Sequence, residues 1–312
     1  MKVLITGGAG YLGSVLTSRL LHAGHHVTVL DNLMYKQDSL VPYCHNPKFE
    51  FFHGDVRDHV LLRNLAEDAD VIFPLAAIVG FPACERDKAL ATDVNYEQVN
   101  FITRYACKKG QRIIYPNTNS GYGVGTDGEC TETSFLNPIS HYGITKCSAE
   151  KAIKDYTDGI TLRLATVFGT SQRMRLDLLV NDFTYKAATD GYVVLFEKDF
   201  KRNYVHIRDV ASAFIFMMDN YERLKGETFN IGLSDANLTK MELCQIIKSH
   251  VPQFSIQCDD IREDPDKRNY IVSNAKVEAA GWKAQISVEQ GVQELLKAYR
   301  IIKPVSVKYG NA

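Results

Sequence analysis

Tyr142 and Lys146 have the spacing at which a phenol and an ammonium can act together. They lie four residues apart in a stretch with a helical pattern that begins after Pro138, and residues four apart share one helix face. A nearby cation stabilises a phenolate and lowers its pKa from about 10, which would let Tyr142 exchange a proton at neutral pH. Taken alone, such a pair more often marks an ordinary surface helix.

A glycine-rich turn near the N-terminus predicts a dinucleotide site. The segment Gly7-Gly8-Ala9-Gly10-Tyr11-Leu12-Gly13 satisfies both GxGxxG and GxxGxxG, and it joins a predicted strand over 3–5 to a predicted helix over 14–23. Glycines permit a tight turn and a close approach of the backbone to a pyrophosphate, whose charge would lie at the helix N-terminus. Because strand, turn and helix occur in this order, a plain glycine-rich turn is the less favoured interpretation.

Acidic residues after the next two strands favour NAD over NADP. Asp31 ends the predicted strand over 27–30, where a carboxylate can bond the adenosine ribose hydroxyls and would repel a 2′-phosphate. Asp55 and Val56 follow the predicted strand over 49–52 and could hold the adenine through the Asp55 side chain and a backbone amide. The alternative for Asp55 is a plain turn residue.

Thr118 adds a hydroxyl to these groups. It follows a predicted strand over 112–115, at the edge of the sheet where a substrate would meet the cofactor. The alternative for this residue is a threonine that caps a turn.

Alternation of strands and helices predicts the α/β class, with a Rossmann-type doubly wound parallel sheet. Two further strands are predicted at 71–73 and 161–164. After Gly169 the pattern changes, which indicates a smaller mixed α/β lobe with a long helix over 173–190, short strands over 192–196 and 229–231, and helices over 239–250 and 288–299. We assign the NAD-binding domain to 1–169, with 201–222 returning to it, and the substrate-binding lobe to 170–200 and 223–312.

Composition limits the class of protein. A chain of 312 residues that is 45% hydrophobic can bury a large core, and a formal charge of −1 gives no general attraction to nucleic acid or to an anionic membrane. No apolar stretch is long enough to span a bilayer, and the first one is too short for a signal peptide, so we expect a cytoplasmic protein. The 7 cysteines include no CxxC pair, which argues against a disulfide framework and a structural zinc site.

Taken together, the motifs resemble the extended short-chain dehydrogenase/reductase superfamily, and within it the nucleotide-sugar epimerase/dehydratase group that includes UDP-galactose 4-epimerase. The resemblance spans nearly the whole chain. The residues that carry it are Gly7 to Gly13, Asp31-Asn32-Leu33, Asp55, Leu75-Ala76-Ala77, Asn95, Thr118, Tyr122-Gly123, Tyr142 and Lys146.

The resemblance implies roles for these residues. Tyr142 would exchange the proton of a sugar hydroxyl while NAD takes the hydride from the same carbon. Lys146 would hold the nicotinamide ribose and tune Tyr142, and Thr118 would bond the reacting oxygen. The resemblance also implies a homodimer formed by helices near 94–108 and 142–156, and a cofactor channel lined by Asn32, Leu75, Ala76, Ala77 and Asn95.

On the substrate side, Arg202 matches the position where this group contacts the diphosphate, and Arg262 lies in a segment that often supplies a second arginine. Guanidinium groups suit phosphate oxygens, although solvated surface charge is the alternative for both. Arg173 and Arg175 are weaker candidates. Thr166 replaces an asparagine that contacts the substrate in many relatives.

Departures from the group narrow the reaction. Its dehydratases carry Asp-Glu directly after the catalytic threonine, where this chain has Asn119-Ser120, so the elimination of water loses support. Decarboxylating relatives place glutamate, and some 3,5-epimerases cysteine, at the position of Ser120.

We therefore predict an NAD-dependent nucleotide-sugar epimerase that transiently oxidises a ring hydroxyl, at C4, to a ketone. A C4 dehydrogenase or a 4-ketoreductase would use the same Thr118, Tyr142 and Lys146. A non-catalytic NAD sensor is less favoured, because such a protein would be expected to lose the tyrosine and lysine.

Overall fold

The computed structural model describes residues 1–106, 110–259 and 269–302. Its main feature is a seven-stranded sheet in the order β11-β7-β5-β4-β1-β2-β3, in which all neighbouring strands are parallel. This confirms the predicted Rossmann-type α/β fold. The strands are β1 (Lys2–Thr6), β2 (His26–Asp31), β3 (Phe49–His53), β4 (Val71–Pro74), β5 (Arg112–Thr118), β7 (Ile160–Leu164) and β11 (Thr228–Ile231).

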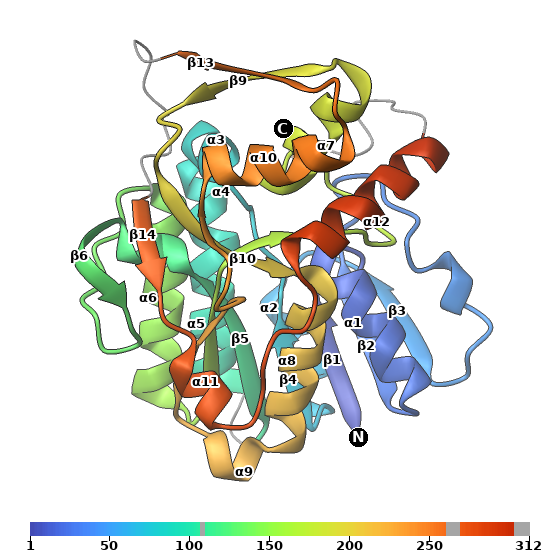
Figure 1. The fold of residues 1–312 in the computed structure, drawn as a ribbon. Coiled ribbons are helices and arrows are strands. Elements are labelled where there is room, and N and C mark those ends of the chain that lie inside the picture. The colour runs from blue at the N-terminus through green and yellow to red at the C-terminus, as the bar shows by residue number, and fades with distance from the viewer. Residues whose placement is uncertain (107–109, 260–268, 303–312) are drawn as a thin grey trace.

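Helices cover both faces of this sheet (Figure 1). In β1, Val3 and Ile5 pack into the apolar cluster that includes α1 (Tyr11–His22) and α8 (Ile207–Asp219), while Leu4 points into the opposite cluster. Both sides of the strand are apolar because both sides are covered. The opposite face carries α2 (His59–Glu67), α6 (His141–Tyr156) and a helical run made of α4 (Lys88–Thr92), α5 (Gln98–Phe101) and π-helical turns at Asp93–Glu97 and Ile102–Ala106.

The second part of the molecule lies above the carboxyl ends of the main strands (Figure 1). It contains three small sheets, in which β10 pairs with β8 and β12, β9 with β13, and β14 with β6. Their bounds are β6 (Val124–Cys130), β8 (Thr166–Phe168), β9 (Tyr192–Phe196), β10 (Lys201–His206), β12 (Asn237–Thr239), β13 (Ser255–Asp259) and β14 (Asn269–Val272). The helices are α7 (Leu179–Thr189), α10 (Lys240–His250) and α12 (Val288–Ile301), with short helices α3 (Phe81–Arg86), α9 (Tyr221–Leu224) and α11 (Ala275–Ala279) elsewhere in the chain.

The predicted helix over 173–190 is wrong at its start, since α7 begins only at Leu179. The Asn181 side chain donates a hydrogen bond to the Arg175 carbonyl at 2.8 Å and accepts one from the Gly169 amide at 3.0 Å. These bonds hold residues 173–178 in a non-helical course. Because the segment is not helical, its charged side chains can face the carboxyl edge of the main sheet.

The strand predicted over 229–231 also differs from expectation, because we assigned it to the lobe and the structure places it at the edge of the main sheet. This strand, β11, pairs in parallel with β7 from Thr228 to Ile231. The segment 201–222 is divided: α8 packs against α1 and the main sheet, while β10 belongs to a small sheet.

Glu294 on α12 ties the last helix to the rest of the lobe. Its carboxylate accepts hydrogen bonds from Thr170 and Arg208, and lies 3.3 Å from His206 Nε2. Burial opposes its ionisation, but the contacts with His206, Thr170 and Arg208 outweigh that effect and lower its pKa to about 2. Of the helices that the structure describes, none has the length and apolar character needed to cross a membrane.

Candidate active site

A cavity of about 810 Å³ runs along the carboxyl ends of the parallel strands. The strand order reverses between β1 and β4, and in open α/β sheets the loops diverge at such a point and leave a crevice for ligands. Residues from the loops after β1, β2, β3, β4 and β5 line the cavity together with residues of α6 and the lobe. The geometry of the sheet therefore brings together motifs that lie far apart in the sequence.

The glycine turn forms one wall, and its Gly7, Gly10, Tyr11, Leu12 and Gly13 all line the cavity. Gly7 has φ +71, and a Cβ there would lie 2.7 Å from the Ala76 amide nitrogen. A Cβ on Gly13 would lie 2.3 Å from the Gly7 carbonyl oxygen. The turn and the loop after β4 thus approach too closely for side chains, which leaves the N-terminus of α1 open to an anion.

Asp31 lies at the end of β2, as predicted, and is buried in the cavity wall. Burial raises the pKa of its carboxyl group, and hydrogen bonds from the amides of Leu33 at 2.8 Å and Ala9 at 3.0 Å oppose that rise. The neighbouring Asn32 also lines the cavity. This carboxylate is held rigidly beside the glycine turn, in the position that suits the hydroxyls of an adenosine ribose.

Asp55 and Val56 reach the same end of the cavity from the loop after β3. The guanidinium of Arg57 donates two hydrogen bonds of 2.9 Å to the Asp55 carboxylate and lowers its pKa to about 2. The Arg57 amide donates to the same carboxylate at 2.9 Å, and Asn32 Nδ2 donates to it at 3.3 Å. Asp55 therefore joins the two loops that follow β2 and β3.

Thr118, Tyr142 and Lys146 line the opposite part of the cavity. Thr118 ends β5, and its hydroxyl donates to Ser120 Oγ at 3.0 Å and accepts from the Ser120 amide at 3.1 Å. Tyr142 and Lys146 lie on α6, whose first turn is capped by Ser140 through a 3.1 Å bond from the Gly143 amide. The sequence predicted this set, and the fold brings its members to one surface.

Lys146 is buried in apolar surroundings. Its Nζ lies 4.0 Å from the centre of the Tyr115 ring, which is itself fully buried in β5. Burial lowers the pKa of Lys146 to about 7, because the charged form loses its hydration. A ligand group that accepts a hydrogen bond from the ammonium would favour the charged form and oppose this shift.

The loop after β4 supplies Leu75, Ala76 and Ala77 to the cavity, as expected, but Asn95 lies behind this wall. The Asn95 side chain is buried, accepts a hydrogen bond from the Ile78 amide at 2.7 Å and donates one to the Ile78 carbonyl at 3.0 Å. Asn95 therefore fixes the shape of the loop and does not line the channel.

Thr166 and Arg202 lie on the adjacent strands β8 and β10, and both line the cavity. Arg173 and Arg175 also line it, and Arg175 forms a 2.5 Å ion pair with Asp177. Arg262 lies outside the described residues. The lobe thus contributes three arginine side chains to a cavity that is otherwise lined largely by the loops after the parallel strands.

Sequence reasoning missed other residues of the wall. Arg57 has a weak signal in hindsight, since it follows the strand end that carries Asp55. Tyr35 and Tyr270 also line the cavity. The Tyr35 ring lies 4.8 Å below the Arg173 guanidinium, and Tyr270 comes from β14, so only the tertiary structure brings these two side chains to the site.

Residues 3–232 match the sequence model of the NAD dependent epimerase/dehydratase family. The chain belongs to this family. Its cofactor is NAD, and the glycine turn, which a Cβ would fill, fits the backbone approach that a dinucleotide requires.

Known relatives of this family match nearly the whole chain. The low-salt glycan biosynthesis protein Agl12 of Haloferax volcanii is 28% identical over 309 residues, which cover 96% of this chain and 98% of that protein. The UDP-glucose 4-epimerase of Thermotoga maritima, solved with UDP-glucose, has a TM-score of 0.83 at 26% identity over 96% of this chain and 99% of that one. The dTDP-glucose 4,6-dehydratase DesIV of Streptomyces venezuelae, solved with NAD and TYD bound, has a TM-score of 0.85 at 26% identity over 96% and 97%.

Replacing Gly13 with alanine is expected to reduce the NAD content of the purified protein on the order of tenfold. The added Cβ would lie 2.3 Å from the Gly7 carbonyl oxygen and 2.6 Å from Gly8 Cα, so the turn must open. Gly128→Ala is the matched control, since nothing lies within 4 Å of a Cβ there. Cofactor released by denaturation measures the effect, and a Gly13→Ala protein with full NAD content would contradict it.

Replacing Lys146 with methionine is expected to stabilise the NAD-free protein, most strongly at low pH. The pKa of Lys146 falls from 10.5 to about 7 on folding, so burial of the charged form opposes folding. This opposition is complete below about pH 7 and disappears as the pH rises through about 10.5.

We expect the thermal midpoint of Lys146→Met to rise by several degrees at about pH 6 and to change little at about pH 10. Scanning fluorimetry of both proteins across this range measures the difference. An equal rise at the two pH values, or a fall at the lower one, would show that burial of the charge does not set the stability at this position.

Proposed function

We propose that the chain is a nucleotide-sugar 4-epimerase that oxidises the C4 hydroxyl of its substrate transiently and reduces the ketone on its other face. The observation that carries this proposal is the meeting of Thr118, Tyr142 and Lys146 with the glycine turn in one cavity. NAD bound along the glycine turn would supply the acceptor for the hydride of the sugar carbon and the donor that restores it. The likeness to a UDP-glucose 4-epimerase over nearly the whole chain supports the same reading.

The residues divide the proton chemistry among them. Tyr142 takes the hydroxyl proton as a phenolate, and the ammonium of Lys146, one turn further along the same face of α6, stabilises that phenolate. Thr118 donates its hydroxyl to the reacting oxygen in exchange for its bond to Ser120 Oγ. When the ketone is reduced, the same groups return the proton in reverse.

Two features argue against net elimination of water, although DesIV is a dehydratase. Asn119 and Ser120 follow the catalytic threonine, and both are buried. Neither is a carboxylate, so this position offers no acid/base pair for removing a hydroxyl and a proton. A C4 dehydrogenase or 4-ketoreductase remains the second candidate, because it would use the same three residues.

Arg202 and Thr166 support a nucleoside-diphosphate sugar as the substrate. Arg202 is only 4% exposed yet lines the cavity, and a buried guanidinium at a ligand surface suits the oxygens of a diphosphate. Thr166 lies on the neighbouring strand β8, lines the same cavity and offers a short hydroxyl side chain to a substrate there.

The test is an assay of purified protein with a panel of nucleotide sugars. We expect co-purified NAD, a sugar inverted at C4, and no net change in NADH absorbance. Stoichiometric accumulation of NADH, or its consumption with a keto-sugar, would replace the epimerase with a dehydrogenase or a ketoreductase. Tight NAD binding without turnover on any sugar would indicate a sensor.

Tyr142→Phe should retain NAD and lose turnover by a factor on the order of 10² to 10⁴. Phenylalanine keeps the packing of α6 but has no proton to exchange. Cofactor content and turnover of the same preparation measure the two effects, and near-normal turnover would remove Tyr142 from the acid/base role.

We also propose a homodimer formed by α6 and the helical run before β5. Its support is the exposure of apolar side chains on these helices: Ile144 is 47% exposed, and Tyr105 and Tyr156 are each 49% exposed. Sedimentation at micromolar concentration should give twice the chain mass. A single species at 35.1 kDa would contradict the proposal, and Ile144→Asp should shift the dimer toward that monomer.

A further inference from the structure

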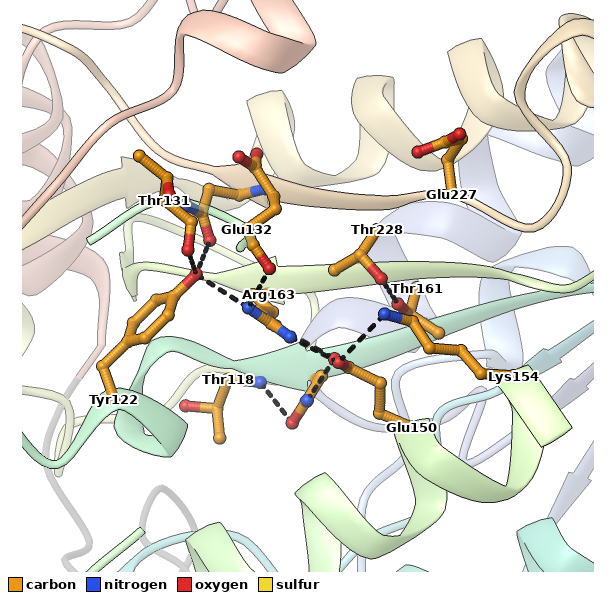
Figure 2. A network of polar contacts seen from close by, with 12 residues as sticks. Thr118, Tyr122, Thr131, Glu132, Glu150, Lys154, Thr161, Arg163, Glu227 and Thr228 are labelled. Carbon is orange, nitrogen blue, oxygen red and sulfur yellow. Dashed lines mark hydrogen bonds and ion pairs between the residues drawn. The ribbon is translucent and has the colours of Figure 1, made fainter. Parts of the chain in front are cut away.

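A charged pair lies buried directly behind the end of β5, which carries Thr118 (Figure 2). Glu150 on α6 and Arg163 on β7 each have side chains only 4% exposed, and Arg163 Nη2 lies 2.6 Å from Glu150 Oε1. Arg163 Nε also donates to Glu150 Oε2 at 3.2 Å. Burial disfavours the ionised carboxylate, but the bonds from Arg163 outweigh it and hold the pKa of Glu150 below its usual value.

Glu150 is connected to Thr118 through one side chain. Asn117 Nδ2 donates to Glu150 Oε2 at 2.5 Å, and Asn117 Oδ1 accepts from the Thr118 amide at 2.8 Å. A carboxylate can only accept hydrogen bonds. It therefore forces Asn117 to turn its NH₂ group toward Glu150 and its oxygen toward Thr118, which fixes the backbone from which the catalytic hydroxyl projects.

Arg163 is anchored on its far side. Its Nη1 donates to Tyr122 Oη and to the Glu132 carbonyl, both at 3.1 Å. Tyr122 Oη donates to Asn230 Oδ1 on β11 at 2.6 Å, and Figure 2 shows this chain of bonds running from Tyr122 through Arg163 to Glu150. Strands β5, β7 and β11 and helix α6 thus share one polar network beneath the cavity.

A buried ion pair is weak evidence of stability, because apolar residues of similar volume often replace it without loss of stability. The specific effect of the Glu150–Arg163 pair is therefore the geometry that it imposes on its neighbours.

We propose that Glu150, held by Arg163, is a positioning residue for the reaction: it sets the orientation of Asn117 and thereby the placement of Thr118. This rests on the proposed function. Glutamine at position 150 has one acceptor oxygen where Arg163 and Asn117 use two. If its NH₂ group replaces Oε2, Asn117 loses its bond or reverses its amide and presents a second donor to the Thr118 N–H. If it replaces Oε1, it faces Arg163 Nη2 donor to donor and breaks the pair that holds the side chain.

A double-mutant cycle of Glu150→Gln with Thr118→Val tests this role. We expect Glu150→Gln to lower kcat on the order of tenfold to a hundredfold, with KM and NAD content near those of the wild type. In the Thr118→Val background the same change should alter kcat by less than about twofold, because the group that Glu150 positions is gone. Equal losses in both backgrounds would overturn the proposal.

Two further variants separate positioning from folding. Lys154 lies 3.7 Å from the same carboxylate but is 40% exposed, and Lys154→Gln should leave kcat unchanged. Asn117→Ala breaks the connection while the Glu150–Arg163 pair stays intact, so it serves if Glu150→Gln does not fold. It should show the same loss and the same non-additivity with Thr118→Val, and normal kcat in Asn117→Ala would overturn the proposal.

The wild-type enzyme separates the two levels of the account. If it turns over a nucleotide sugar and the cycle is additive, only the positioning role fails. If it is inactive on every sugar tested, the proposed function fails and the positioning role fails with it.

Discussion

The chain leaves β1 through a gap that has no room for side chains. At Gly7 a Cβ would touch the backbone of Ala76, and at Gly13 it would touch the backbone of Gly7. This close approach places the N-terminus of α1 at the crevice between β1 and β4, and the acidic residue at the end of β2 beside it. The site to which we assign the cofactor therefore follows from packing of backbone against backbone, and the other side chains of the cavity lie around it.

The part of the cavity to which we assign catalysis contains buried charge. Lys146 lies over the Tyr115 ring with a lowered pKa, which opposes the stability of the folded chain while it makes the ammonium responsive to what binds beside it. One turn further along α6, Glu150 is also buried but is paired by Arg163. Helix α6 thus carries Lys146, a buried cation with a lowered pKa, at the cavity, and Glu150, a buried anion paired with Arg163, behind it.

Much of the fold could be predicted, because its signals are local. Short apolar runs alternating with helices predicted six strands of the main sheet at nearly their observed positions. The glycine turn from Gly7 to Gly13 predicted a dinucleotide cofactor. Tyr142 and Lys146 were predicted on one helix face because their spacing alone determines it. The carboxyl ends of parallel strands then bring these motifs to one edge.

The remaining features depend on contacts that the sequence does not reveal. The run over 229–231 predicts a strand but not which sheet it joins. The start of α7 is set by the side-chain bonds of Asn181, which no periodicity contains. A motif resemblance gave the position of Asn95 but not the direction of its side chain, and Tyr270 reaches the cavity only because β14 pairs with β6.

The most direct test of the central claim follows a deuterium atom placed at C4 of the nucleotide sugar that the enzyme accepts. The account predicts that the product is inverted at C4 and keeps the deuterium there, with no hydrogen taken from solvent at that carbon, as read by mass spectrometry and NMR. Loss of the label to free reduced cofactor, to water, or to another carbon of the sugar would contradict a reaction in which one hydride leaves C4 and returns to it.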